Sequence, residues 1–444
     1  MSDLLAARSQ MAMSLAFHIV FAVVGMGMPL LMAFSEWRWQ RSGEQVYLLL
    51  AKRWAKGTAV LFAVGAVSGT VLSFELGLLW PKFMSWAGAI IGMPFSLEGF
   101  AFFAEAIFLG VYLYGWDRIS PRAHLTAGVL VAVSGAASGM FVVFANAWMN
   151  TPAGFLLRDG QPMDVRPMAA MFNPSAWPQS IHMLLAAYAA TGFAVAGIHA
   201  YALLSDQKNL FHRRALQLAL LVGGIGAVLQ PLSGDFLGKS VARHQPVKFA
   251  ATEGQFESET HAPLRIGGWP DTTQRETRYA IEIPGVLSFL AFSDSSALVR
   301  GLNEFPPGVW PPVAPVHISF QIMVASGFAM TFVTLWAGWR QWRSPSIAAS
   351  RAFLWAVTVC APLGFIAIEA GWFVTELGRQ PWIIQGVMRT ADAVTPMPGL
   401  IVPFLAITLL YLVLGAIVIM LLLRQVRESP GGADQQPHSG GVVR

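Results

Sequence analysis

Charged side chains are scarce in this sequence of 444 residues, and cysteine occurs once. The charged share is 12%, about half of that found in soluble domains, which excludes a soluble globular protein of this length. The lone Cys360 excludes an internal disulfide and a thiolate cluster, so we predict a small core residue there. Met1–Gln10 has no basic segment, and no small-residue cleavage site follows, so we predict no cleavable signal peptide.

Long apolar runs are what the sequence has in abundance. Hydrophobic residues make up 55% of it, and the mean hydropathy is strongly positive. A bilayer crossing needs about 20 mostly apolar residues in a helix. Nine runs meet that length and predict an all-α polytopic membrane protein: Met11–Phe34, Thr58–Leu79, Phe95–Trp116, Leu125–Trp148, Ser180–Leu204, Ala215–Leu237, Pro315–Trp336, Ala352–Glu376 and Leu400–Leu423.

Basic residues follow the odd-numbered spans, whereas the opposite short loops carry only scattered ones. By the positive-inside rule, the N-terminus is predicted outside and the C-terminus in the cytoplasm. The slight positive charge of the chain is therefore a signal of orientation in a lipid bilayer and does not indicate a nucleic-acid partner. The basic residues that set it are Arg38, Arg41, Lys52, Arg53, Lys56, Arg118, Arg122, Lys208, Arg213, Arg214, Arg340, Arg343, Arg351, Arg424 and Arg427.

These features divide the chain into four parts. We predict spans one to six in residues 1–237, an outer loop in 238–312, spans seven to nine in 313–427, and a disordered cytoplasmic tail in 428–444. The outer loop is long for a connector, which indicates either function or disorder. Two small-residue pairs, Gly65 with Gly69 and Gly135 with Gly139, predict close helix contacts, with a flat face for a porphyrin as the alternative.

The end of the eighth span carries a carboxylate where lipid-facing charge is costly. Glu376 follows more than twenty mostly apolar residues, and a charge there costs up to about 3 kcal/mol. Glu369 and Trp372 share its helix face, and Arg379 follows just outside the membrane. A metal, a proton pathway or a buried ion pair would each offset the cost, so these residues alone leave a structural and a functional role open.

Three further spans each hold a candidate metal ligand early in the span: His18, His182 and Met323. A histidine inside a membrane is a functional hypothesis by default, although a hydrogen-bonded structural histidine explains either position equally well. Met323 alone is unremarkable among 19 methionines. The predicted topology places all three, together with Glu376, in the outer part of the bilayer. A shared depth is expected of residues that hold redox centres close enough for electron transfer.

The third span carries two carboxyl groups, Glu98 and Glu105, seven residues apart. This spacing places them on one helix face about 10 Å apart, as in a proton relay toward an oxygen site. The alternative is a pair of neutral, hydrogen-bonded structural carboxyls. Both lie in the predicted outer half, so they would form only the end of a route from the cytoplasm.

Several motifs together resemble subunit I of the cytochrome bd family of quinol oxidases, in register over nearly the whole chain. They are Gly378-Arg379-Gln380-Pro381-Trp382, the acidic third span with Gly115-Trp116-Asp117-Arg118, Ala145-Asn146-Ala147-Trp148-Met149-Asn150-Thr151-Pro152-Ala153-Gly154, and Gln245-Pro246-Val247-Lys248-Phe249-Ala250-Ala251-Thr252-Glu253. The resemblance implies helical bundles around three haems.

The resemblance also implies roles for individual residues. His182 and Met323 would be the axial ligands of a low-spin haem b. His18 and Glu376 would each ligate one of two high-spin haems, one of them haem b and the other haem d or a haem b in its place. Trp372 and Arg379 would contact the cofactor, and Glu98, Glu105 and Glu376 would serve catalysis.

Lys248 and Glu253 match the family's quinol-binding positions in the outer loop. Without the resemblance, a lysine and a glutamate in a polar loop are expected to be solvated charges. Two departures stand out: the loop lacks the long insertion of some members, and Gln321 replaces an arginine two residues before Met323. Both departures resemble the cyanide-insensitive branch, and the lost charge should lower the potential of the low-spin haem.

The expected function is therefore a terminal oxidase subunit of the bacterial inner membrane. It would oxidise ubiquinol or menaquinol at the outer face and reduce O2 to water with cytoplasmic protons, which generates a proton motive force without pumping. The resemblance implies a second hydrophobic subunit and allows a small single-span accessory subunit.

Two other functions fit parts of the sequence. A multihaem quinol dehydrogenase would share His182 and Met323 but would not need a high-spin site at Glu376. A proton-coupled transporter would use Glu98, Glu105 and Glu376, and it predicts a colourless protein with related halves. Large internal repeats are not evident in the sequence.

Overall fold

The computed structural model describes residues 1–343 and 350–427, so the predicted tail, 428–444, lies outside the described residues. Within them, nine helical segments are long and apolar enough to cross a membrane, which confirms the all-α polytopic class. They are α1 (Asp3–Ser42), α2 (Gln45–Leu79), α3 (Pro81–Tyr114), α4 (Pro121–Asn150), α6 (Ala176–Ser205), α7 (Leu210–His244), α10 (Val313–Arg343), α11 (Arg351–Cys360) followed by α12 (Leu363–Leu377), and α14 (Ile401–Arg427).

Most of these helices extend beyond the apolar runs of the sequence. Polar caps explain where several of them begin: the side chains of Ser2, Ser120, Asn209 and Ser350 each accept a hydrogen bond from a first-turn backbone N–H. Hydropathy detects only the part of a helix that lies in lipid, so it misses such polar ends.

The eighth span differs from its prediction as one continuous helix. It consists of α11 and α12, which are separated at Ala361 and Pro362. Proline lacks a backbone N–H and clashes with the preceding turn, which accounts for the interruption. Because α12 begins anew after Pro362, it sets the direction in which Glu376 is presented.

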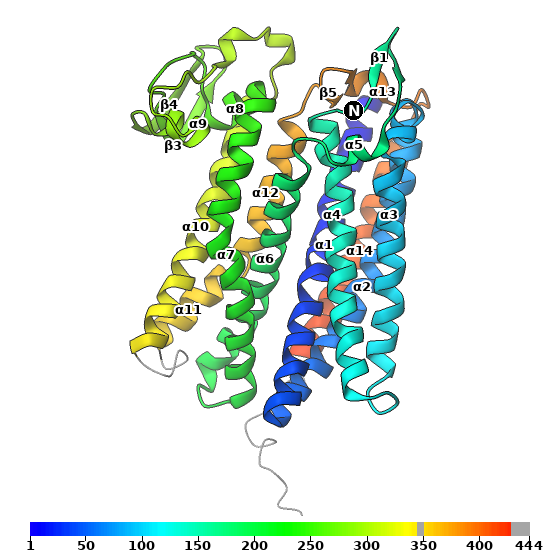
Figure 1. Cartoon of the computed structure of the whole chain (residues 1–444), viewed down its shortest axis with the longest axis vertical. Coiled ribbons are helices and arrows are strands. Elements are labelled where there is room, and N and C mark those ends of the chain that lie inside the picture. Colours follow the sequence, from blue (N-terminus) through cyan, green and yellow to red (C-terminus); the bar gives the residue numbers. More distant parts are fainter. Residues whose placement is uncertain (344–349, 428–444) are drawn as a thin grey trace, which may run out of the picture.

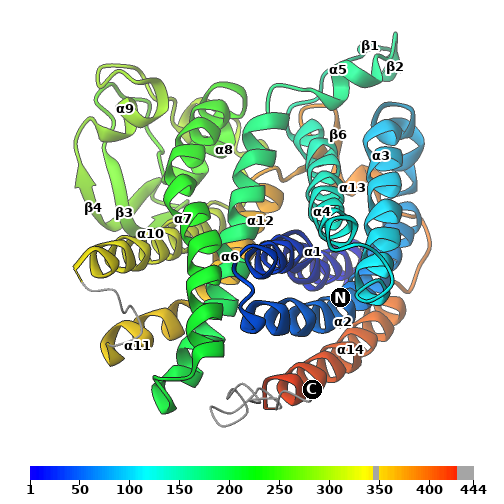
Figure 2. The same ribbon diagram turned by 60° about the horizontal axis from the view of Figure 1, so that its bottom comes forward.

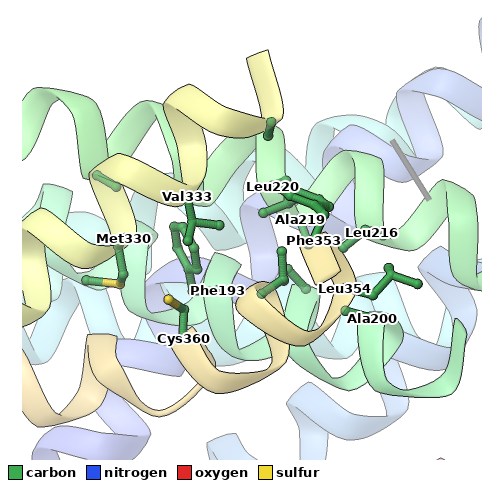
Figure 3. Close-up of a cluster of buried hydrophobic side chains, with 14 of the residues drawn as sticks. Phe193, Ala200, Leu216, Ala219, Leu220, Met330, Val333, Phe353, Leu354 and Cys360 are labelled. Carbon is green, nitrogen blue, oxygen red and sulfur yellow. The ribbon is translucent and has the colours of Figure 1, made fainter. Parts of the chain in front are cut away.

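The helices pack in two groups that meet where α6 packs against α1 and α4. One group contains α1, α2, α3 and α4, with α14 against α1 and α2; the other contains α6, α7, α10, α11 and α12 (Figures 1 and 2). An apolar cluster fills the second group between α6, α7, α10 and α11, and it includes Phe193, Phe353 and the predicted core residue Cys360 (Figure 3). At the crossing of α6 and α7, Gly192 and Gly223 face each other with no room for a side chain.

The predicted small-residue pairs on α2 and α4 both face α1. A Cβ at Gly65 would lie 3.3 Å from Phe21, and one at Gly135 would lie 3.2 Å from the backbone oxygen of Gly25. These glycines therefore permit close helix contact, as predicted.

The longer connecting segments that the structure describes gather at the end of the bundle that carries the N-terminus, which we call the loop end (Figure 1). The long outer loop forms α8 (Pro246–Glu253), the antiparallel strands β3 (Leu264–Asp271) and β4 (Glu276–Ile283), α9 (Val286–Phe292), η1 (Leu302–Glu304) and η2 (Pro307–Val309). Smaller segments beside it are β1 (Leu156–Arg158), β2 (Gln161–Met163), α5 (Pro167–Met171), β5 (Trp382–Ile384), β6 (Met388–Arg389) and α13 (Thr390–Ala393). Of the two alternatives for the outer loop, the structure shows an ordered segment.

Candidate haem and quinol sites

His18 on α1 is held by a serine on α2. Its Nδ1 lies 3.0 Å from the Ser68 Oγ, and that hydroxyl donates to the backbone oxygen of Val64 at 2.9 Å. Ser68 therefore accepts the proton on Nδ1, which leaves the lone pair of Nε2 available to a metal. A Cβ at Gly69 would lie only 2.9 Å from the ring, so the absence of a side chain there lets His18 pack closely against α2.

His182 on α6 has the same arrangement with α7. Its Nδ1 lies 3.0 Å from the Ser233 Oγ, which donates to the backbone oxygen of Gln230 at 3.0 Å. The lone pair of Nε2 accepts a hydrogen bond from the Gln230 amide at 3.0 Å. This amide would have to turn away for a metal to bind Nε2. Ser68, Ser233 and Gln230 were not predicted, because sequence spacing alone does not pair residues on different helices.

Met323 lies on α10, which packs against α7 and α12, and α6 packs against the same two helices. On α12, Gly371 faces the thioether: a Cβ there would lie 3.0 Å from the Met323 sulfur. The absence of a side chain at Gly371 leaves the sulfur room toward the space between α10 and α12.

Glu376 ends α12 and binds two partners. Its Oε1 accepts a hydrogen bond from the Asn146 amide at 2.6 Å, and its Oε2 pairs with Arg379 at 2.5 Å. Asn146 in turn accepts from Gln179 on α6 at 2.8 Å. Each carboxylate oxygen retains a second lone pair, so a metal could bind Glu376 without breaking either contact.

The surroundings fit a haem. Both histidines are of the tautomer that ligates through Nε2, and glycines face His18 and Met323. Arg379 is 3% exposed, yet its Nε and Nη1 have no hydrogen-bond partner among the described residues. A buried guanidinium with free N–H groups is suited to a carboxylate such as a haem propionate. Trp372, the other predicted cofactor contact, packs against the apolar cluster that joins α1, α6 and α12.

The two carboxyls of α3 both face α4. Glu98 lies 3.4 Å from the Ser138 hydroxyl, and Glu105 lies opposite Gly135, where a Cβ would come within 3.1 Å of its Oε1. A Cβ at Gly25 on α1 would lie 3.8 Å from the same oxygen. Glu105 is therefore enclosed between α1, α3 and α4.

A buried pair that sequence reasoning missed lies farther along the same seam. Tyr112, seven residues after Glu105, contacts His124, whose Nδ1 lies 2.9 Å from the Glu36 Oε1. The other ring nitrogen donates to the Tyr112 backbone oxygen at 2.9 Å, so a proton must lie between Nδ1 and Glu36. Gln40 also donates to Glu36, at 3.0 Å. This pair lies near the end of the bundle opposite the loop end.

Lys248 and Glu253 lie on α8 and are buried, in contrast to the solvated charges that a polar loop suggests. They are 7% and 4% exposed. Burial, reinforced by Arg379, lowers the pKa of Lys248 to about 7, although Glu376 opposes the shift. Burial raises the pKa of Glu253 to about 8, with Arg265 opposing. The Glu253 Oε2 has no hydrogen-bond partner among the described residues.

Lys248 also connects the loop to Glu376. Its ammonium donates to the Asn150 side chain, and the Asn150 amide donates to the Asn146 backbone at 3.0 Å. Asn146 binds Glu376, as described above. The Lys248 side chain packs against Gly378, where a Cβ would lie 2.9 Å from its Cγ. Asn146 and Asn150 stand four residues apart in the quoted motif, so their shared helix face was visible in the sequence.

Two residues of α10 fix the loop above them. His317 is fully buried, with Nδ1 2.8 Å from the Thr252 oxygen and Nε2 3.0 Å from the Gly267 oxygen. The Gln321 side chain accepts from the Gly267 N–H and donates to the Arg265 oxygen, both at 3.0 Å. The residue that departs from the family pattern therefore ties β3 to α10, a structural role that its position near Met323 did not predict.

Comparisons with known proteins agree with these features. Residues 6–430 match the family described as cytochrome bd terminal oxidase subunit I. In Bacillus subtilis, a putative cytochrome bd menaquinol oxidase subunit I is 39% identical over 98% of this chain and 99% of its own length. A cytochrome bd ubiquinol oxidase subunit 1 of the same species is 31% identical over 99% of this chain and 96% of its own length.

A solved structure shares the fold as well. The bd oxidase from Geobacillus thermodenitrificans superposes with a TM-score of 0.91 at 40% identity, covering 97% of this chain and 99% of that one. The family match and the superposition thus both extend over nearly the whole chain. The chain therefore belongs to the cytochrome bd terminal oxidase subunit I family, whose members are quinol:oxygen oxidoreductases of bacterial membranes.

Proposed function

We propose that this subunit oxidises quinol at Lys248 and Glu253 and that His18, His182, Met323 and Glu376 hold three haems. The observation that carries the proposal is the hydrogen-bond chain from the buried Lys248 through Asn150 and Asn146 to the partly buried Glu376. It links the predicted quinol site and a predicted haem ligand at the loop end. Neither a quinol dehydrogenase without a high-spin site nor a transporter requires this link.

The proposed ligands come from both helix groups: His18 from the first, and His182, Met323 and Glu376 from the second. His182 and Met323 would hold a low-spin haem b within the second group, and His18 and Glu376 would each hold one high-spin haem. Bound haem would accept electrons from quinol and deliver them to oxygen. The pyridine haemochrome spectrum of the purified oxidase tests this content and separates haem d from haem b. A protein without haem would contradict the proposal.

At the quinol site, Glu253 would accept a hydroxyl proton and Lys248 would stabilise the developing anion. A base acts best when its pKa lies near the working pH, and burial brings the pKa of Glu253 to about 8. The unpartnered Oε2 of Glu253 is the atom able to accept the proton. Its route onward would lead to the outside, since α8 lies at the loop end (Figure 1).

These two groups predict a bell-shaped pH profile for quinol oxidation. Glu253 must be ionised, so the rate rises as the pH passes its pKa of about 8. Lys248 must be charged, so the rate falls as the pH rises through about 7, and the maximum lies between these values. In steady-state assays of the whole oxidase, Glu253→Gln should remove the acidic limb and slow quinol oxidation about 100-fold.

Glu276→Gln on the exposed strand β4 is the matched control and should retain both limbs of the pH profile of quinol oxidation. Haem spectra should stay unchanged in Glu253→Gln, since Glu253 lies outside the chain of hydrogen bonds to Glu376. If a one-electron donor and quinol lose activity equally in that variant, Glu253 acts at another step.

We propose that protons for oxygen reduction enter along the seam between α1, α3 and α4. The Glu36–His124 pair would take up a proton at the end opposite the loop end, which the basic residues assign to the cytoplasm. Glu105 and Glu98 follow toward the loop end in steps of about 10 Å on the same face of α3. Ordered water between them would complete the path. With the Glu36–His124 pair at its start, the proposed route has more of its length within this chain than Glu98 and Glu105 alone would supply.

Glu105→Gln should slow oxygen reduction about 100-fold while quinol still reduces the haems, because the amide cannot relay a proton. Stopped-flow measurement of haem reduction and oxygen consumption separates these two steps. Ser138→Ala should slow oxygen reduction less, since the hydrogen bond from the Ser138 hydroxyl to Glu98 is long at 3.4 Å. Normal turnover of Glu105→Gln would exclude this route.

The family works with a second subunit and quinol. We propose that the protein lies in the inner bacterial membrane, with its loop end outside and its C-terminus in the cytoplasm. Protons released at the loop end and taken up at the opposite end would generate a membrane potential without pumping. A small single-span accessory subunit is a further proposal, which mass spectrometry of the purified complex would test.

A further inference from the structure

A buried polar cluster lies toward the loop end from His18, between α1, α2 and α14. It consists of Gln10 and Ser14 on α1, Glu75 on α2 and Tyr411 on α14, none more than 4% exposed. Gln10 donates to the Glu75 Oε1 at 2.8 Å. Ser14 lies beside both the Glu75 carboxyl and the Tyr411 hydroxyl. The proposed quinol and proton sites use none of these residues.

Each member of the cluster has a buried oxygen atom without a well-formed hydrogen bond among the described residues. These atoms are the Gln10 Oε1, the Ser14 Oγ, the Glu75 Oε2 and the Tyr411 Oη. Buried polar atoms are rarely left unpaired, and internal water commonly supplies the missing partner. Two of the four atoms belong to hydroxyl groups that can donate, and the amide oxygen is an acceptor only. Water placed among them would satisfy the set.

Glu75 is the only carboxyl in the cluster, and no basic side chain in the described part of the chain forms an ion pair with it. A carboxylate charge within a membrane is costly unless it is paired. The titratable group that interacts with it is Tyr411 on α14. Helix α3 contributes apolar side chains such as Phe83 near the adjoining end of α2. A cationic partner is therefore missing among the described residues, and the Gln10 amide is the hydrogen-bond donor that the structure gives this carboxyl, which favours a role in binding a proton.

The cluster and Glu105 lie on opposite sides of His18 along α1. Gln10, Ser14 and His18 follow each other at four-residue steps on one helix face, and Gly25, which faces Glu105, is seven residues farther on. On α2, Glu75 stands seven residues beyond Ser68, the residue that holds the His18 ring. Two helical turns correspond to about 10 Å. At this distance, a change of charge at His18 is felt by a buried carboxyl.

We propose that Glu75, with water held by Gln10, Ser14 and Tyr411, is a proton-binding site coupled to reduction of the haem at His18. When one electron from quinol adds a negative charge there, one proton from solvent forms an O–H bond on the Glu75 carboxylate. Oxidation releases this proton again. The inference rests on the proposed role of His18 as a haem ligand.

Redox titration of the whole oxidase at several pH values tests the coupling. The midpoint potential of the His18 haem should fall with rising pH, and Glu75→Gln should lessen this slope. In the reduced-minus-oxidised infrared spectrum, Glu75→Gln should lose a carboxylic C=O band, which Tyr411→Phe should shift without removing it. Glu105→Gln should retain this particular band, because Glu105 is enclosed between α1, α3 and α4 and so lies outside the cluster.

An unchanged slope with all carboxylic bands retained in Glu75→Gln would overturn the inference. Glutamine preserves the shape of the Glu75 side chain and can still accept a hydrogen bond from Gln10. If Glu75→Gln does not assemble, Ser14→Ala is the second test and should shift the carboxylic C=O band. An unshifted band in Ser14→Ala would also contradict the proposal. The premise is tested separately by His18→Ala. Retention of every haem in that variant would refute the role of His18 itself.

Discussion

Replacement of Glu376 by glutamine is expected to remove or loosen one high-spin haem and to lower oxygen consumption at least about 100-fold. Glutamine retains the length of the side chain and an oxygen able to accept from Asn146, but it loses the charge that pairs with Arg379 and would bind ferric iron. Haem content and oxygen uptake of the purified variant are the measurements. Glu376→Asp, shorter by about 1.5 Å, should weaken the haem site less severely.

The matched control is Glu369→Gln, two turns earlier on the same helix. Glu369 also has a buried carboxyl oxygen without a hydrogen-bond partner among the described residues, so both substitutions remove a carboxyl from α12. Only the Glu376 variant should lose haem. Full haem occupancy with normal turnover in Glu376→Gln would show that Glu376 is a structural residue at the helix end.

The membrane class and the nine spans could be predicted because hydropathy is a local property of the chain. The family followed from motifs whose residues are contiguous. The interruption before Pro362 was also visible in principle, since proline lacks the N–H that a helix interior requires. These features depend only on neighbours in the sequence.

The contacts that build the sites depend on how the helices lie beside one another. Asn146 and Glu376 are 230 residues apart, and no local pattern pairs them. Lys248 looked like a solvated charge because its loop is polar, yet α8 folds it against Gly378 at the end of α12. Because of this position, substitution of Lys248 should disturb the Glu376 site as well as quinol oxidation, whereas substitution of Glu253 should affect quinol oxidation alone.

The same limit explains the missed pairs. Glu36 and His124 come from α1 and α4, and Gln10 and Glu75 from α1 and α2. Each is an isolated polar residue near the end of an apolar run, where exposure to solvent is the ordinary expectation. Only the packing of helices around them shows that they are buried.

Met323→Leu should remove the sharp absorption band of the reduced low-spin haem and leave the other haems in place. Leucine has nearly the volume of methionine, so the packing against Gly371 should change little, but it has no sulfur lone pair to bind iron. Electron entry from quinol should then fail, as it should in His182→Ala, because both remove an axial ligand of the proposed relay.

Met330→Leu is the control for this experiment. Met330 lies two turns farther along α10, 3% exposed in the apolar cluster of Figure 3, with Phe193 and Cys360 nearby. Both substitutions exchange a thioether for an alkyl side chain on one helix, so any general effect on packing is common to them. Loss of the band in Met323→Leu alone would therefore assign ligation to its sulfur, and a retained band in a stably assembled Met323→Leu oxidase would refute that assignment.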